Sequence, residues 1–229
     1  MEQTTRQFRA DFDRIALLSN DDAADHNLRY LNFLLQHLPP RCAHALEIGC
    51  GTGTFSRLLA QRAEHVLALD FSPNMIGLAE ARSQEEEHKN IDFQCQDATI
   101  WEFPVEKFDC VASIATLHHL PMKEMLLKMK TALKPCGTLL VLDLFQMDGV
   151  LDMLSGALAL PVSVCLRLFK TGRLRAPREV REAWEEHGRH DSYLTMSELS
   201  ELCRAVLPAA QLRKHLLWRY SIVWRKPDA

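Results

Sequence analysis

Glu47-Ile48-Gly49-Cys50-Gly51-Thr52-Gly53, the glycine loop of this chain, follows the β-prone run HALEI and precedes the helical pattern TFSRLLAQRA. Glycines at such a junction let the backbone turn tightly and approach a ligand without obstruction by a Cβ atom. The dinucleotide fingerprint G-x-G-x-x-G is excluded by spacing, because its third glycine would fall on Thr54 or Ser56. The loop therefore indicates a ligand site of another type, beside the plainer interpretation that it is a structural turn of an α/β protein.

Short β-prone runs and helical patterns alternate from Ala43 onward. After the glycine loop and its helix come HVLALD, NMIGLAEARSQEEE, IDFQC, FDCVASI, KEMLLKMKTAL and TLLVLDLF. This order is typical of right-handed βαβ units, whose parallel strands form a sheet with helices on both faces. Ser72-Pro73 is expected to begin one helix, and Pro135-Cys136-Gly137 to end the helix before TLLVLDLF. The predicted fold class is α/β, with a doubly wound, mostly parallel sheet.

The chain is predicted to form a single domain over residues 1–229. Its predicted parts are an N-terminal helical cap, a core, a helical lid or substrate region and a C-terminal strand pair, over residues 1–40, 43–145, 146–208 and 209–229. The strand pair is expected because two β-prone runs flank Trp218-Arg219-Tyr220, so that the last two strands can form a hairpin on the sheet edge.

Composition narrows the class of protein. The chain has 229 residues, of which 47% are hydrophobic, enough for a substantial core. A formal net charge of −3 with 25% charged residues does not favour nucleic acid as the main partner. Seven cysteines without a C-x-x-C pair fit reduced, mostly buried thiols. With no apolar signal segment at the N-terminus, the expected location is cytoplasmic.

The pattern E-x-G-x-G-x-G resembles motif I of the class I S-adenosylmethionine-dependent methyltransferases. LKPCGTL resembles the family's L-x-P-G-G-x-L, with Cys136 in place of one glycine. The resemblance covers residues 43–145 and implies a seven-stranded Rossmann-like methyltransferase fold with a helical cap. It also implies S-adenosylmethionine as cofactor and S-adenosylhomocysteine as product. The whole chain looks like a bacterial group of small methyltransferases.

The resemblance also implies which residues hold the cofactor. Asp70, at the end of LALDFS, is placed to accept hydrogen bonds from both ribose hydroxyls, and Asp97, in FQCQDAT, to receive the adenine amino group. Either aspartate could instead simply form a turn at a strand end, and the residues flanking adenine could instead pack a helix N-terminus. The full predicted set is Glu47, Gly49, Gly51, Gly53, Asp70, Phe71, Met75, Asp97, Ala98 and Ile114.

Two histidines, His118 and His119, follow the fourth predicted strand at the carboxyl edge of the sheet, where open α/β folds bind ligands. A histidine there can act as general base towards a hydroxyl or an ammonium group. The alternative is a histidine that caps the loop or packs against the cofactor. Nucleic-acid amino-methyltransferases carry an acidic residue or Asn followed by Pro-Pro and an aromatic residue here, and this chain does not.

A second polar cluster contains His187, His190 and Tyr193. Gly188 interrupts any helical face and no third ligand is clearly spaced, so a metal site is not predicted. The cluster is expected either to line the acceptor pocket, with these three residues as catalytic candidates, or to form a solvated polar turn.

The apolar stretch 150–169 leads into a basic run over residues 167–181. Together they could form a lid over a hydrophobic acceptor, an interfacial element near anionic lipid, or an ordinary core helix with a solvated turn. A membrane-spanning helix is not expected, because Asp152, Pro161 and Arg167 interrupt the stretch.

The predicted function is transfer of a methyl group to oxygen or nitrogen of a small, partly apolar molecule. The reaction is an in-line displacement to which a protein contributes mainly alignment and exclusion of water. The alternatives are methyl transfer to RNA or protein, with the basic run as the binding surface, and a cofactor-binding interaction module without catalysis. The sequence leaves open the acceptor, the methylated atom and the oligomeric state.

Overall fold

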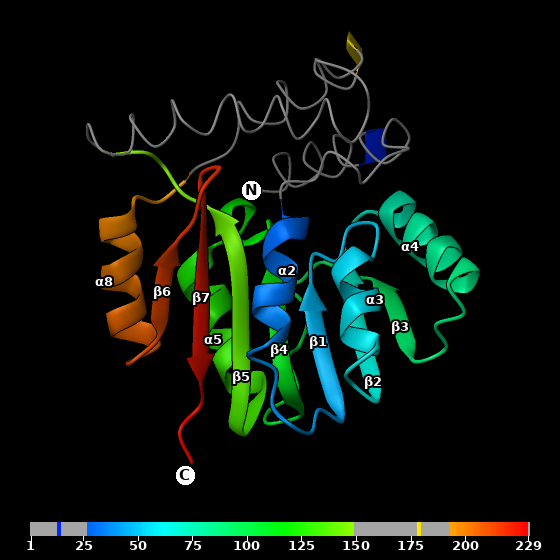
Figure 1. The fold of residues 1–229 in the computed structure, drawn as a ribbon, viewed down its shortest axis with the longest axis horizontal. Coiled ribbons are helices and arrows are strands. Elements are labelled where there is room, and N and C mark those ends of the chain that lie inside the picture. The colour runs from blue at the N-terminus through cyan, green and yellow to red at the C-terminus, as the bar shows by residue number, and fades with distance from the viewer. Residues whose placement is uncertain (1–12, 15–26, 149–177, 180–192, 229) are drawn as a thin grey trace.

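Seven strands form one mixed sheet in the order β3-β2-β1-β4-β5-β7-β6 (Figure 1). The computed structural model describes residues 13–14, 27–148, 178–179 and 193–228. The strands are β1 (His44–Ile48), β2 (His65–Asp70), β3 (Ile91–Cys95), β4 (Phe108–Ile114), β5 (Leu133–Leu144), β6 (Gln211–Lys214) and β7 (Arg219–Arg225). Strands β1 to β5 pair in parallel, and β7 lies antiparallel between β5 and β6. The predicted fold class and the terminal hairpin are confirmed.

Helices cover both faces of the sheet (Figure 1). Helices α2 (Leu28–Leu35), α3 (Thr54–Ala60) and α4 (Pro73–Glu85) pack on one face, and α5 (Met122–Ala132) and α8 (Met196–Val206) on the other. A short 3₁₀ helix, η2 (Leu117–His119), follows β4. Ser72 caps α4, since its side chain accepts a hydrogen bond from the N–H of Met75, as the Ser72-Pro73 pair predicts.

The alternation of side chains along β5 explains the two apolar layers. Leu139 and Val141 belong to the cluster under α5 and α8, whereas Leu140 and Leu142 belong to the cluster under α2 and α3. Successive side chains of a strand point to opposite faces, so a strand in the middle of a covered sheet is apolar throughout. Between Leu139 and Leu144 the exception is Asp143, which is also fully buried.

The chain changes direction across the sheet between β1 and β4. From β1 it builds outward through β2 to β3, and then it returns to β4 on the other side of β1. Such a switch point leaves a crevice at the carboxyl ends of the two central strands, where open α/β sheets bind ligands. The sheet order therefore places the loop after β1 beside the loop after β4.

Strand β5 begins earlier than the sequence pattern predicts. It starts at Leu133 instead of Thr138, and its pairing with β4 shifts register between Phe108 and Cys110. The Pro135-Cys136-Gly137 segment is therefore an irregular start of the strand and not the loop that ends a helix. Cys136 lies there with φ of +61°, the left-handed conformation that favours glycine.

The proposed division of the chain stays a prediction, because most of the N-terminal cap and of the lid lies outside the described residues. In the part of the chain that the structure describes, no helix is long and apolar enough to cross a membrane.

Replacement of Cys136 by glycine is expected to stabilise the fold. The left-handed conformation costs an L residue about 1–2 kcal/mol, and the greater freedom of glycine in the unfolded chain offsets part of the gain. We expect a net increase of about 0.5–1 kcal/mol in the free energy of unfolding, measured by urea denaturation. Cys136→Ala removes the thiol but keeps the Cβ atom, so an equal gain in that control would contradict the explanation.

Candidate functional site

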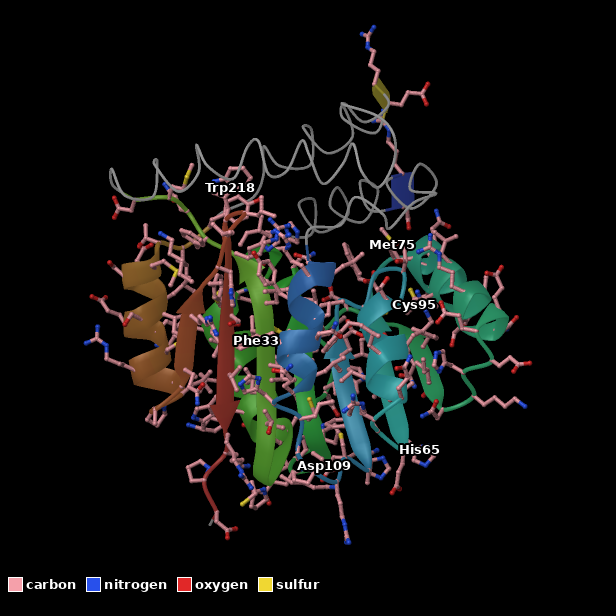
Figure 2. The ribbon with its side chains drawn as sticks, in the orientation of Figure 1. Phe33, His65, Met75, Cys95, Asp109 and Trp218 are labelled. Carbon is pink, nitrogen blue, oxygen red and sulfur yellow. The ribbon has the colours of Figure 1, made fainter. Side chains whose placement is uncertain are left out.

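The predicted cofactor-site residues that end or follow β1 to β4 lie at one edge of the sheet. The glycine loop follows β1, Asp70 ends β2, Asp97 follows β3, and Ile114 ends β4. Because these strands are parallel, all four positions lie at the same carboxyl edge. In Figure 2 this is the upper edge, where Met75 is labelled, while Asp109 and His65 lie at the opposite edge.

The three loop glycines meet three different surroundings. A Cβ atom on Gly49 would lie 2.2 Å from Oγ1 of Thr116, and one on Gly53 would lie 3.0 Å from Cβ of Ala79. A Cβ atom on Gly51 would have no described atom within 4 Å. All three glycines have positive φ, between +52° and +77°. Gly49 and Gly53 thus allow close packing, whereas Gly51 keeps open the side from which a ligand can approach the backbone.

Asp70 ties the glycine loop to the end of β2. One carboxylate oxygen accepts a hydrogen bond from the N–H of Gly51 at 2.8 Å, and the other accepts one from the N–H of Ser72 at 2.9 Å. The side chain is buried, and this burial raises its pKa, while the backbone hydrogen bonds oppose the shift. A carboxylate oxygen has a second lone pair, so both oxygens can still accept a hydroxyl.

Glu47 lies at the end of β1 beneath the loop and is 1% exposed. The hydroxyl of Ser56, on α3, donates a hydrogen bond to its carboxyl group. Burial raises the pKa of Glu47 to about 8, despite the opposing effect of that hydrogen bond. Glu47 is therefore mostly protonated at neutral pH, and a cation bound nearby would favour its ionised form.

The loop after β3 has a fixed conformation. Asp97 accepts hydrogen bonds from both the N–H and the hydroxyl of Thr99. Lys128, on α5, donates to the carbonyl oxygens of Thr99 at 2.6 Å and of Ala98 at 3.5 Å. Asp97 is half-buried, so it can still meet a ligand. The adenine contacts of Asp97 and Ala98 remain predictions.

Phe71 directly follows β2, and Met75 lies in the first turn of α4. Phe71 is partly exposed, whereas Met75 is buried at the start of α4. The structure thus gives Met75 a packing contact of the helix N-terminus, and the predicted contacts of both residues with adenine stay predictions.

His118 is held by Asp143 of the neighbouring strand β5. Nδ1 of His118 lies 2.5 Å from one carboxylate oxygen of Asp143, and the backbone N–H of His118 donates to the other at 3.0 Å. The Asp143 side chain is 0% exposed. Sequence reasoning missed Asp143, although one signal was available: it is the only charged residue in the apolar strand TLLVLDLF.

Tyr193 joins His118 from a distant part of the chain. Its ring centroid lies 5.0 Å from that of His118. Residues 193–195 are held next to the end of β5 by two contacts. The N–H of Gln146 donates a hydrogen bond to the carbonyl of Leu194 at 2.9 Å, and Thr195 forms a β-bridge with Gln146. Thr195 also makes the capping box that begins α8.

The structure therefore brings together part of each predicted histidine cluster. His119 packs its ring 3.7 Å from that of His118, centroid to centroid, beside Tyr193. His187 and His190 lie outside the described residues. Within the described ranges, no group of three or more His, Cys, Asp or Glu side chains could hold a metal ion.

Comparison with known proteins finds a family match within this chain. Residues 45–137 match the methyltransferase domain family. The ubiquinone biosynthesis O-methyltransferase of Coxiella burnetii is 33% identical over 110 residues, which are 48% of this chain and 47% of that protein. Phosphoethanolamine N-methyltransferase 2 of Caenorhabditis elegans is 35% identical over 98 residues, 42% of this chain and 22% of that protein. The match to these relatives thus spans about half of their length or less.

Solved structures share the fold across most of the chain. A putative methyltransferase of Haloferax volcanii, solved in complex with the Trm112 methyltransferase activator, superposes with a TM-score of 0.65 at 15% identity. The superposition covers 94% of this chain and 97% of that one.

Alanine at Gly49 and at Gly51 is expected to affect stability unequally. Gly51→Ala should cost only the left-handed backbone penalty of about 1 kcal/mol. Gly49→Ala adds the clash with Thr116 and should cost about 3 kcal/mol or more. Urea denaturation of both variants measures the difference, and equal losses would show that the clash at Gly49 is relieved without cost.

The free energy of unfolding is expected to carry a pH dependence from Glu47. Its pKa rises from an ordinary value of 4.5 to about 8 on folding, so the folded state binds more protons and stability falls as pH rises through that window. Glu47→Gln removes this slope, and the variant should gain on the wild type between pH 5 and 8 by up to about 1.4 kcal/mol per pH unit. Urea denaturation at several pH values measures this difference in the free energy of unfolding, and Glu85→Gln, at an exposed position, is the control. A difference between Glu47→Gln and the wild type that does not change with pH would refute the assignment.

Proposed function

We propose that this chain, which belongs to the class I S-adenosylmethionine-dependent methyltransferases, transfers the methyl group to an oxygen or nitrogen atom of a small, partly apolar molecule. The observation that carries the proposal is the meeting of two groups at one edge of the sheet. The glycine loop and Asp70 lie at the carboxyl ends of β1 and β2, and the His118–Asp143 pair lies beside them at the ends of β4 and β5.

The residues at the first half of the edge fit the cofactor. Gly51 leaves open a space that a Cβ atom would fill, which is what close approach of a ligand to the loop requires. Asp70 would accept hydrogen bonds from the ribose hydroxyls through its remaining lone pairs, and Asp97 would accept one from the adenine amino group. When bound, S-adenosylmethionine supplies a methyl group on a positively charged sulfur.

Glu47 adds an electrostatic contribution below the loop. It is buried and accepts a hydrogen bond from Ser56, so its carboxyl group is held in one place. A positively charged ligand above the loop would be favoured by ionisation of Glu47, directly or through the loop amides.

The residues at the second half of the edge fit an acceptor with a proton to lose. His118 has Nδ1 engaged with Asp143, which makes Nε2 the nitrogen that would take the proton from an attacking hydroxyl, or from an ammonium group before the resulting amine attacks. The ring of Tyr193 beside His118 provides an apolar wall for a partly apolar acceptor. The names of the two relatives above, one an O-methyltransferase and one an N-methyltransferase, support acceptors of this size and these two atoms.

Cofactor binding is tested by calorimetric titration with S-adenosylmethionine and S-adenosylhomocysteine. We expect Asp70→Asn to weaken binding about 10-fold or more, because a buried hydrogen-bond acceptor towards the ribose contributes roughly 1–3 kcal/mol. Asp92→Asn, on the exposed face of β3, is the matched control and should bind like the wild type. A folded wild-type protein that binds neither compound would favour the non-catalytic interaction module.

Acceptor class is tested with radiolabelled S-adenosylmethionine. The label is offered with pools of small hydroxy and amino compounds, with total RNA and with total protein. We expect label in low-molecular-weight products, and label confined to RNA or protein would replace the small-molecule proposal by the corresponding alternative.

A further inference from the structure

We infer that Asp143 is a positioning residue that sets the tautomer of His118, with hydrogen on Nδ1 and the lone pair of Nε2 directed to the acceptor. The inference rests on the proposed function, because it assigns how the base of that site is prepared. It adds to the site a residue that lies in the sheet and that no motif of the sequence singles out.

Both carboxylate oxygens of Asp143 engage the same histidine. One lies 2.5 Å from Nδ1 and the other accepts a hydrogen bond from the backbone N–H of His118, so the ring and the main chain of η2 are held by one group. The backbone N–H of Leu144 donates to the first oxygen at 2.8 Å. Three donors therefore converge on a fully buried carboxylate, as a buried charge requires.

This arrangement decides where the proton of the ring sits. An ionised carboxylate only accepts hydrogen bonds, so Nδ1 must carry the hydrogen. A neutral imidazole has one donor and one acceptor nitrogen, and Nε2 is therefore the basic one. The position of Asp143 in the sheet thus removes the tautomer in which Nε2 would carry the hydrogen.

The His118–Asp143 pair is faced by groups from β7, from η2 and from the segment before α8. Tyr220 lies opposite Asp143 in the register of β7, and burial raises its pKa well above the ordinary value, so it stays neutral. Its hydroxyl lies 3.8 Å from the sulfur of Met122. The rings of His119 and Tyr193 flank His118. Among these described groups Asp143 is the acidic partner of His118.

The same carboxylate stabilises the charge that the reaction creates. As the acceptor oxygen or nitrogen forms its bond to the methyl carbon, the electron pair of the carbon–sulfur bond stays on sulfur. The proton of the acceptor passes to Nε2 of His118, and the imidazolium that results faces Asp143.

The test uses Asp143→Asn in the full chain, with Asp109→Asn as the matched control. Asp109 is a strand aspartate that accepts hydrogen bonds from the backbone N–H of His44 and from Lys134, but it lies at the opposite edge (Figure 2). We expect kcat of Asp143→Asn to fall roughly 10²–10³-fold, as for loss of a general base, with the Kd for S-adenosylmethionine unchanged within about two-fold. The control should keep both values.

The pH profile separates positioning from a merely structural contribution. The carboxylate faces the imidazolium that forms on proton transfer, so the rising limb of kcat against pH should shift in Asp143→Asn, whereas a loss of packing alone would leave it in place. A double variant that combines His118→Gln with Asp143→Asn should be no slower than His118→Gln alone, because the two substitutions disable the same base. An unmoved limb, or additive losses, would overturn the inference.

Nitrogen NMR on the labelled wild-type protein tests the inference without turnover. We expect His118 to show the neutral tautomer with hydrogen on Nδ1, assigned by comparison with His118→Gln. The opposite tautomer in the wild type would overturn the inference even if Asp143→Asn fails to fold. The expected tautomer in a protein that methylates no acceptor would uphold the positioning by Asp143 and reject the proposed function instead.

Discussion

The parallel pairing of β1 with β2 on one side and with β4 on the other is the constraint on which the site depends. It aligns the ends of three strands, so that the glycine loop, Asp70 and the segment leading to His118 start from neighbouring points. The close approach of Gly49 to Thr116 is a direct consequence, because the loops after β1 and β4 leave the sheet side by side. A side chain at Gly49 would push these two loops apart.

The edge is also where buried carboxyl groups collect, and each is accommodated differently. Glu47 has a pKa raised by burial and holds its proton, with a hydrogen bond from Ser56. Asp70 accepts hydrogen bonds from the backbone N–H groups of Gly51 and Ser72. Asp143 is paired with His118. An isolated buried charge would cost several kcal/mol, so protonation, backbone donors and a hydrogen-bonded histidine each make one acid tolerable.

These three solutions divide the edge into halves with different chemistry. In the half formed by β1 and β2, both acids face the loop, which suits a ligand with hydroxyl groups and positive charge. In the half formed by β4 and β5, an acid supports a base, which suits a group that must lose a proton. Methyl transfer needs a cofactor site next to a separate site for the group that loses its proton. The switch point between β1 and β4 lies between these two halves of the edge.

The sequence by itself determined the alternation of strands and helices, the glycine loop and the two aspartates at strand ends, because each of these features is local. Strand propensity, a turn at Gly49 to Gly53 and an acid directly after a strand all depend on residues near one another in the chain. The start of β5 at Leu133 was not predicted. The residues around Pro135 indicate the end of a helix, but Leu133 pairs with Phe108 of β4 and so already belongs to the strand.

Only the tertiary structure decided the partner of His118, the approach of Tyr193 and the place of β7 between β5 and β6. Asp143 is 25 positions away from His118 in the sequence, and Tyr193 reaches the pair because Gln146 and Thr195 bridge. Such contacts depend on which strands become neighbours and on the face that each side chain takes. Hydrogen bonds between strands settle both, and they form between residues that have no relation along the chain.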